Sequence, residues 1–106
     1  MRFAASHELV LSEKMKVTRE LLVEHLPHVV HVLEHITDEQ WHDERIKDDL
    51  LSYISSAGLK NGQILRPLRA MLTGAEASPG AFEMLAILGK EESLVRIHEY
   101  AASLSE

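Results

Sequence analysis

Apolar residues recur along the chain with the spacing of amphipathic helices. In the first clear stripe, the steps between apolar positions are four, three, four and three residues, which is the period of one helix face. Its members are Leu22, Leu26, Val29, Leu33 and Ile36. Thr18 precedes the stripe, and its hydroxyl is suited to cap the N-terminus of a helix. Pro27 lies inside it and lacks a backbone donor, so we expect a kinked helix over residues 18–40, with a kink or break at the proline.

Similar stripes predict four further helices, over about 41–56, 61–72, 79–88 and 91–104. Gly58 and Gly74 follow two of them, where glycine accepts the left-handed conformation that ends a helix. Ser78 and Pro79 have the pattern of an N-cap and a first helical residue. In the last two helices we expect these residues to face inward: Phe82, Leu85, Ala86, Leu94, Ile97, Ala101 and Leu104. No alternating run predicts a strand, so the predicted class is all-α, a compact multihelical domain of about five helices.

Length and composition are consistent with a single domain over residues 1–106, with an irregular arm over 1–17. A chain of 106 residues that is 45% hydrophobic can bury one core. It has no cysteine, which excludes disulfides, thiolate nucleophiles and cysteine–zinc sites. No apolar run has the length of a membrane span or of a signal-peptide core. We therefore expect a cytoplasmic protein without a membrane partner.

Charge is distributed unevenly along the chain. The net charge is −6, which argues against wholesale wrapping of nucleic acid. Residues 57–75 nevertheless contain Lys60, Arg66 and Arg69 and no acidic residue. Three cations alone favour an ordinary solvated helix face, but a local site for a polyanion, if there is one, should lie here.

A histidine cluster on the first predicted helix offers a second candidate chemistry. Residues 31–35 match the H-x-x-E-H pattern of inverted zinc proteases, and His28 lies one helical turn before His31. Such a protease also needs a distal ligand and a much longer chain. A partly solvated histidine flank is the simpler explanation, and adventitious metal binding by His28, His31 and His35 is the alternative.

Catalytic motifs are absent from the sequence. Two weak candidates have simpler explanations, since His42 beside Asp43 is better explained as a helix cap, and Trp41 as a core anchor. Residues 14–16 (Lys-Met-Lys) lack the serine of the KMSKS loop of class I aminoacyl-tRNA synthetases, and no HIGH-like motif accompanies them. There is no phosphate-binding glycine loop or nucleophile elbow either. We therefore predict no catalytic residue in these 106 residues.

Four spaced motifs carry a family resemblance. They are GLK-x-G from Gly58, PLR-x-x-LTG from Pro67, SPG-x-FE from Ser78 and LGKE from Leu88. This succession resembles the C-terminal anticodon-binding region of bacterial-type glutamyl-tRNA synthetases. The match is dense over residues 41–97, so residues 41–106 form the part closest to the family, and it thins over 7–40.

The resemblance implies a function and a set of site residues. In this family the domain reads the first two anticodon bases, and the third is read largely from a preceding subdomain. The motif positions fall on Arg69, Ser78 and Ala81, where Ala81 is smaller than the usual aliphatic residue. We add Lys60 and Arg66 as candidate phosphate contacts.

The implied partners are the anticodon loop of a glutamate-accepting tRNA and, if the chain is attached to its synthetase, the catalytic domain in cis. No DNA partner is expected. No cofactor is expected in this domain, because ATP and Mg²⁺ belong to the catalytic domain of the parent ligase. The sequence leaves two alternatives open: a free-standing relative of that domain, and a helical protein-interaction module derived from it that no longer binds RNA.

Overall fold

The computed structural model describes residues 10, 11, 16–74 and 80–104. The regular elements in this part of the chain are five α-helices and one short 3-10 helix, which confirms the predicted all-α class. In chain order they are α2 (Arg19–Glu34), η1 (Asp38–Gln40), α3 (Asp43–Ser56), α4 (Asn61–Thr73), α5 (Ala81–Leu88) and α6 (Lys90–Leu104).

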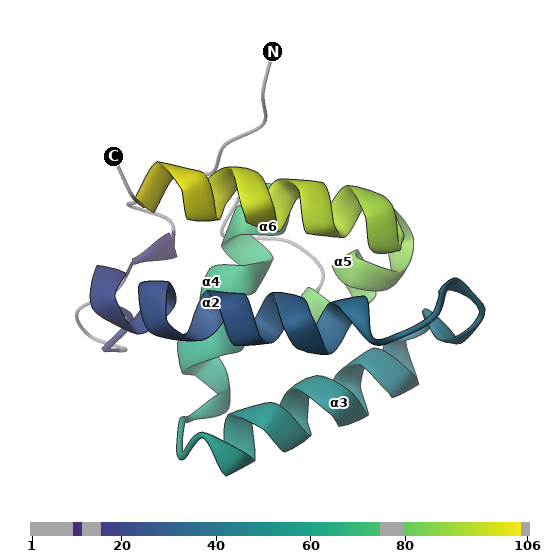
Figure 1. Ribbon diagram of the computed structural model, residues 1–106, viewed down its shortest axis with the longest axis horizontal. Helices are drawn as coiled ribbons and strands as arrows, with labels where there is room; N and C mark the ends of the chain where they lie inside the picture. Colours follow the sequence, from purple (N-terminus) through teal and green to yellow (C-terminus); the bar gives the residue numbers. More distant parts are fainter. Residues whose placement is uncertain (1–9, 12–15, 75–79, 105–106) are drawn as a thin grey trace.

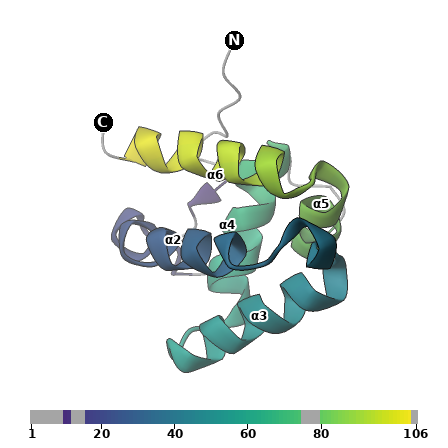
Figure 2. The same cartoon turned by 45° about the vertical axis from the view of Figure 1, so that its right-hand side comes forward.

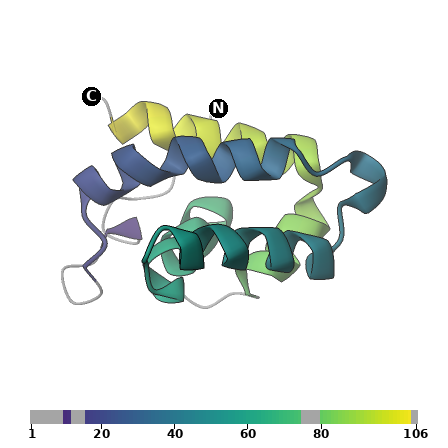
Figure 3. The same cartoon turned by 60° about the horizontal axis from the view of Figure 1, so that its bottom comes forward.

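The helices pack around α2 and α6, which lie side by side and run in opposite directions (Figure 1). Helix α3 packs on α2 at the face away from α6, as the view from below shows (Figure 3). Helix α4 crosses the direction of α2 and α6 at a steep angle and contacts α3, α5 and α6 (Figures 1 and 2). Short α5 fills one end of this arrangement, in contact with α3, α4 and α6. This packing brings the start of α5 against α4, which determines the site described below.

Helix ends follow the capping residues of the sequence. The Thr18 hydroxyl accepts the backbone N–H of Leu21 at 3.1 Å, and His42 Nδ1 accepts the N–H of Arg45 at 3.3 Å. His42 is thus a helix cap, as predicted. Gly58 and Gly74 have φ values of +72° and +70°, the left-handed conformation that ends α3 and α4.

Two of the predicted helix boundaries differ from the structure. Helix α2 runs through Pro27 without a break and ends at Glu34. The carbonyl that loses its usual donor belongs to Val23, and both Val23 and Pro27 are exposed, so water can bind that carbonyl. Helix α5 begins at Ala81 with Gly80 as its N-cap, whereas the sequence predicted a start at Pro79.

The buried core contains the whole stripe predicted for α2. Helix α6 differs in part, because Ser93 and Tyr100 are fully buried, whereas the predicted Leu94 and Ala101 are only partly buried against the core. The Ser93 hydroxyl donates to the carbonyl of Leu85 at 3.4 Å. Ser93 Oγ is therefore buried with a hydrogen-bond partner.

At each end of the α2–α6 pair, a cationic side chain of one helix binds a backbone carbonyl of the other. Arg19, at the start of α2, donates through Nη1 to the carbonyl of Leu104 at the end of α6, at 2.6 Å. Lys90, at the start of α6, donates through Nζ to the carbonyl of Glu34 at the end of α2, at 3.0 Å. A cation at a helix C-terminus also interacts favourably with the helix dipole. The two contacts therefore stabilise the antiparallel pair at both ends.

Trp41 connects η1 to α5 through a directed hydrogen bond. Its ring packs against the core, and Nε1–H donates to the carbonyl of Leu85 at 2.7 Å. We expect Trp41→Phe to lower the free energy of unfolding by about 1–2 kcal/mol, because the ring loses area and the carbonyl loses a donor. Urea denaturation followed by far-UV circular dichroism measures this, since the variant has no tryptophan fluorescence. An unchanged midpoint would contradict the proposed anchoring role.

Candidate nucleic-acid interface

A hollow of about 330 Å³ lies between α4 and the start of α5. Its lining residues are Leu65, Arg66, Arg69, Gly80, Ala81 and Phe82. Three of the residues singled out from the sequence, Arg66, Arg69 and Ala81, thus meet in one place although up to 15 positions separate them in the chain. The volume lies at the low end of the range for small-ligand pockets, so the hollow has room for a small flat group such as a base.

Arg66 and Arg69 differ from the other described arginines in having no polar partner. Arg19 donates to Leu104 O, and Arg45 and Arg96 donate to carboxylates of their own helices, each at 2.9 Å. Within the described part of the chain, no hydrogen bond or ion pair is formed by the guanidinium of Arg66 or Arg69. Two sets of planar donors are therefore available to a ligand at this hollow.

Position on α4 explains why these two arginines line the same hollow. They are three residues apart, so they project from neighbouring points of one helix face. Arg66 is exposed and Arg69 is half-buried, because Pro67, Leu68 and Ala70 take the buried face of α4. The half-buried guanidinium is partly shielded from solvent, which strengthens its interaction with a charged or polar ligand.

Helix α5 contributes its N-terminus to the same hollow. Gly80 is its N-cap, and no side chain caps the first turn among the described residues. The first N–H groups of a helix have no intrahelical acceptor and carry partial positive charge. A Cβ at Gly80 would meet no atom within 4 Å, so a ligand can approach the backbone there.

Ala81 reaches the hollow with little of its surface exposed. It lines the hollow, but only 6% of its surface is exposed. Its methyl group packs chiefly into the core, so little apolar surface remains for a ligand. Ser78, the other predicted site residue at this turn, lies outside the described residues.

Lys60 is not brought to the hollow. It is the exposed N-cap residue of α4, and its backbone N–H donates to Gln63 Oε1 at 2.9 Å. Lys60 does not line the hollow, which begins one turn further along the helix, at Leu65. Its predicted phosphate contact would therefore be made beside the hollow, at the start of the same helix.

Phe82 is the lining residue that sequence reasoning assigned to the core. It is only partly buried and borders two hollows of opposite charge. One contains Arg66 and Arg69, and the other contains Asp43, Glu44 and Glu83 with Lys47. The helical phase could have indicated this position, since buried Ala81 and Leu85 are four residues apart and place Phe82 off their stripe. A polyanion meets attraction on one side of this ring and mainly repulsion on the other.

The histidine cluster lies on another face, between α2 and α3. The rings of His31 and His35 are 4.3 Å apart between centroids, whereas His28 stacks on Tyr53. Burial, followed by the charge of Glu24, raises the pKa of Tyr53. Within the described ranges, no three side chains are placed to hold a metal ion together.

Nor is any helix in those ranges long and apolar enough to cross a membrane.

Comparison with known proteins gives a family for this geometry. A family model described as "Anticodon binding domain" matches residues 2–101. Glutamate–tRNA ligase of Clostridium botulinum (strain Eklund 17B) is 40% identical over 93 residues, 87% of this chain and 19% of the ligase. That of Clostridium acetobutylicum is 40% identical over 91 residues, 85% of this chain and 18% of the ligase.

A more distant relative extends the match. Glutamate–tRNA ligase of Azorhizobium caulinodans is 34% identical over 98 residues, 92% of this chain and 20% of the ligase. The chain therefore spans about a fifth of the length of the curated relatives that it matches. The family model, by contrast, covers nearly all of the chain, and it confirms the resemblance seen in the four motifs. The chain belongs to the anticodon-binding domain family, in the branch that resembles glutamate–tRNA ligases.

Proposed function

We propose that the hollow between α4 and α5 binds unstacked bases of a tRNA anticodon loop and reads the first two of them. The observation that carries the proposal is the pair of arginines without polar partners, Arg66 and Arg69, on a basic, acid-free stretch of an acidic chain. Single-stranded RNA loops expose their Watson–Crick edges, and proteins recognise these edges with planar donors, backbone amides and stacking side chains. The hollow offers all three kinds of group.

Arg69 is the base-reading residue in this proposal. It is half-buried at the edge of the hollow, so its guanidinium can present two parallel N–H groups to a base with little freedom to move. Arg66 is exposed and lies one turn earlier, where it contacts a phosphate. Lys60, at the start of α4, contacts another. Phosphate contacts position the RNA and base contacts determine specificity.

The start of α5 and the sequence just before it supply the remaining contacts. The open N–H groups of the first turn of α5 donate hydrogen bonds to a base held over Gly80, and the Ser78 hydroxyl donates or accepts a further one. Ala81 adds only a small apolar contact, because its side chain is almost wholly buried. Specificity in this chain therefore depends more on Arg69 than on the residue after the Pro-Gly pair.

The relatives of the chain are glutamate–tRNA ligases, and they suggest a role for the whole protein. We propose that the chain serves a cytoplasmic ligase of this kind, attached to it or free-standing. Glutamate is joined to tRNA there at the expense of ATP with Mg²⁺, by a catalytic domain outside these residues. The third anticodon base is read by a subdomain that these residues do not contain.

Binding to glutamate tRNA tests the proposal. We expect affinity to fall steeply with salt, and to fall about tenfold or more when the first or second anticodon base is changed. Arg69→Lys keeps the charge but removes the planar fork. It should therefore keep the salt dependence and lose most of the discrimination at one base. Fluorescence anisotropy with labelled transcripts at several salt concentrations measures both quantities.

The outcomes separate this function from the alternative. Equal affinity for all anticodons, with a normal salt dependence, would overturn the base readout but leave RNA binding. Absence of salt-dependent binding altogether would favour the protein-interaction module. Lys47→Gln is the matched control, since Lys47 is an exposed cation on α3 beside the acidic hollow. It should change neither affinity nor discrimination.

A further inference from the structure

The last turn of α2 presents two histidines side by side. His31 lies in α2 and His35, four residues later, is its C-cap in a helical conformation. Both side chains are exposed, with ring centroids 4.3 Å apart and planes inclined at 59°. Side chains at i and i+4 lie one above the other on a helix. Two imidazoles in this relation can direct nitrogen atoms at a single ion, the arrangement found in helical zinc-binding motifs.

A hydrogen bond determines which nitrogen of His35 is available. His35 Nδ1 lies 2.9 Å from the carbonyl oxygen of His31. Because a carbonyl can only accept, Nδ1 must carry the proton. In the neutral ring Nε2 then holds the lone pair and points away from the helix backbone. Metal-binding histidines are commonly held in this way, with the other nitrogen donating to a carbonyl or carboxylate.

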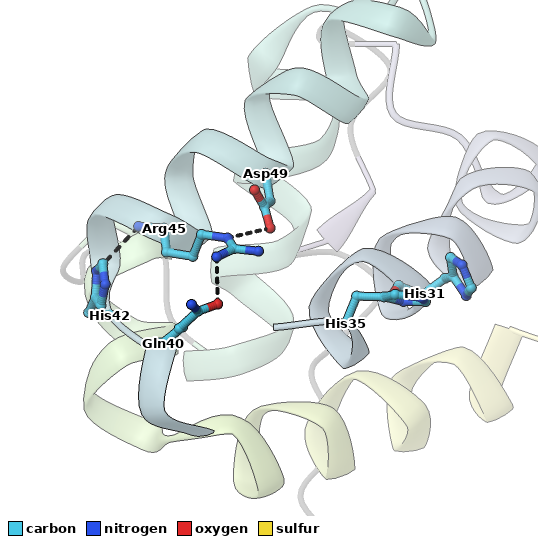
Figure 4. A network of polar contacts seen from close by, with 6 residues as sticks. All are labelled: His31, His35, Gln40, His42, Arg45 and Asp49. Carbon is cyan, nitrogen blue, oxygen red and sulfur yellow. Dashed lines mark hydrogen bonds and ion pairs between the residues drawn. The ribbon is translucent and has the colours of Figure 1, made fainter. Parts of the chain in front are cut away.

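Charged groups of both signs surround this place. Both rings border a hollow of about 580 Å³ between α2 and α3, opposite Asp49. Asp49 Oδ2 accepts from Arg45 Nε at 2.9 Å, and Arg45 Nη1 donates to Gln40 Oε1 at 2.6 Å, so the carboxylate is held in position (Figure 4). The C-terminal end of α2 also carries partial negative charge. Two cations oppose this charge, since Lys90 binds the Glu34 carbonyl and Arg45 is paired with Asp49.

His28 is set apart from this pair. Its ring stacks on Tyr53, with centroids 5.9 Å apart and an interplanar angle of 24°. Release of that stacking would be needed before His28 could join the other two. The helix therefore provides a pair of nitrogen ligands, in agreement with the absence of a three-ligand cluster in the described ranges.

We propose that His31 and His35 chelate one divalent transition-metal ion, with water completing its coordination. Two imidazole nitrogens without thiolates suit Zn²⁺, Ni²⁺ and Cu²⁺, and among these Cu²⁺ should bind most tightly. The ion links the C-cap residue of α2 to the preceding turn, so binding stabilises the end of the helix that leads to η1 and Trp41. This site is independent of the RNA hollow and of the proposed function.

Titration of the untagged 106-residue chain with NiCl₂ and ZnCl₂ tests the proposal. Isothermal titration calorimetry should give one ion per chain, and the melting temperature should rise with metal concentration. His31→Gln and His35→Gln should each lower the affinity at least about tenfold. His28→Gln is the matched control on the same helix, and its affinity should stay within about twofold of the parent chain.

Three results would overturn the proposal. The first is an affinity unchanged by His31→Gln and by His35→Gln, and the second is an equal loss in His28→Gln, which would mean a different ligand set. The third is one ion per two chains, which sedimentation would reveal as metal-linked dimers rather than a chelate within one helix. Far-UV circular dichroism of each variant confirms that α2 is intact. Shifts of the His31 and His35 ring protons on adding Zn²⁺ give a readout that does not depend on stability.

Discussion

Charge reversal of both partnerless arginines, Arg66→Glu with Arg69→Glu, lowers the affinity for glutamate tRNA at least about a hundredfold at physiological salt. Two attractive contacts become two repulsive ones in a chain that already carries −6, and a hundredfold corresponds to about 2.7 kcal/mol. The slope of log affinity against log salt should also fall by roughly one or two units. Anisotropy titrations across a salt series measure both.

Folding should be preserved in this variant. Arg66 is exposed, and neither side chain has a polar partner in the described structure. Loss of the native side chains therefore leaves no buried group unpaired. The two introduced carboxylates lie near the middle of α4, where the helix dipole has little effect, and their mutual repulsion three residues apart costs a few tenths of a kcal/mol. Far-UV circular dichroism and a urea midpoint close to that of the parent chain would verify this.

A second double variant controls for net charge. Lys16→Glu with Lys47→Glu makes the same change in charge at two exposed positions that do not line the hollow. We expect it to weaken tRNA binding only a few-fold, through long-range repulsion. A loss as large as that of the arginine variant would show that net charge, and not the hollow, controls binding.

The sequence predicted most of the fold because helix periods and end signals are local. The α2 stripe is buried in full, and Gly58 and Gly74 end their helices as expected. The inward positions predicted for α6 were partly wrong, for a physical reason. The buried residues of α6 are Ser93, Ile97, Tyr100 and Leu104. Hydrophobicity alone does not predict that a serine faces inward, because its burial depends on a hydrogen-bond partner for the hydroxyl inside the core.

The candidate site was only partly predictable. Arg66 and Arg69 are three residues apart, so their shared face follows from the helix period. Phe82 and Gly80 join them only because α5 packs on α4. For Arg19 the partner is set by tertiary packing, since it lies 85 positions away. The structure thus separates arginines that stabilise the fold from those available to a ligand.

Tyr100 should make the stability of the domain depend on pH in the alkaline range. It is fully buried in α6, and burial raises its pKa to about 12, against a smaller opposing effect of nearby Arg19. The ordinary value for tyrosine is about 10. Between these values the folded chain keeps the phenolic proton and the unfolded chain has lost it. The free energy of unfolding should therefore fall as pH rises, by about 1.4 kcal/mol per unit.

Tyr100→Phe removes this dependence and thereby tests it. At pH 8 the variant should be less stable by about 1 kcal/mol, because no buried polar side-chain atom of the described residues lacks a hydrogen-bond partner. Between pH 10 and 12 the parent chain should lose about 2 kcal/mol that the variant keeps, so their stability curves should cross. Urea denaturation at a series of pH values measures the difference, and other titrating groups cancel because both chains contain them.

Absorbance at 295 nm gives an independent reading, since the chain has only two tyrosines. Tyr53 is half-buried, with its hydroxyl 2.6 Å from His25 Nδ1, and it should ionise in the folded protein. Tyr100 should ionise only as the domain unfolds, so its absorbance change should coincide with the loss of helical circular dichroism. Two results would contradict the burial of Tyr100. One is ionisation of Tyr100 at pH 10 with the helices intact, because the core around α6 would then have to admit water. The other is an equal slope of unfolding free energy against pH in the parent chain and in Tyr100→Phe.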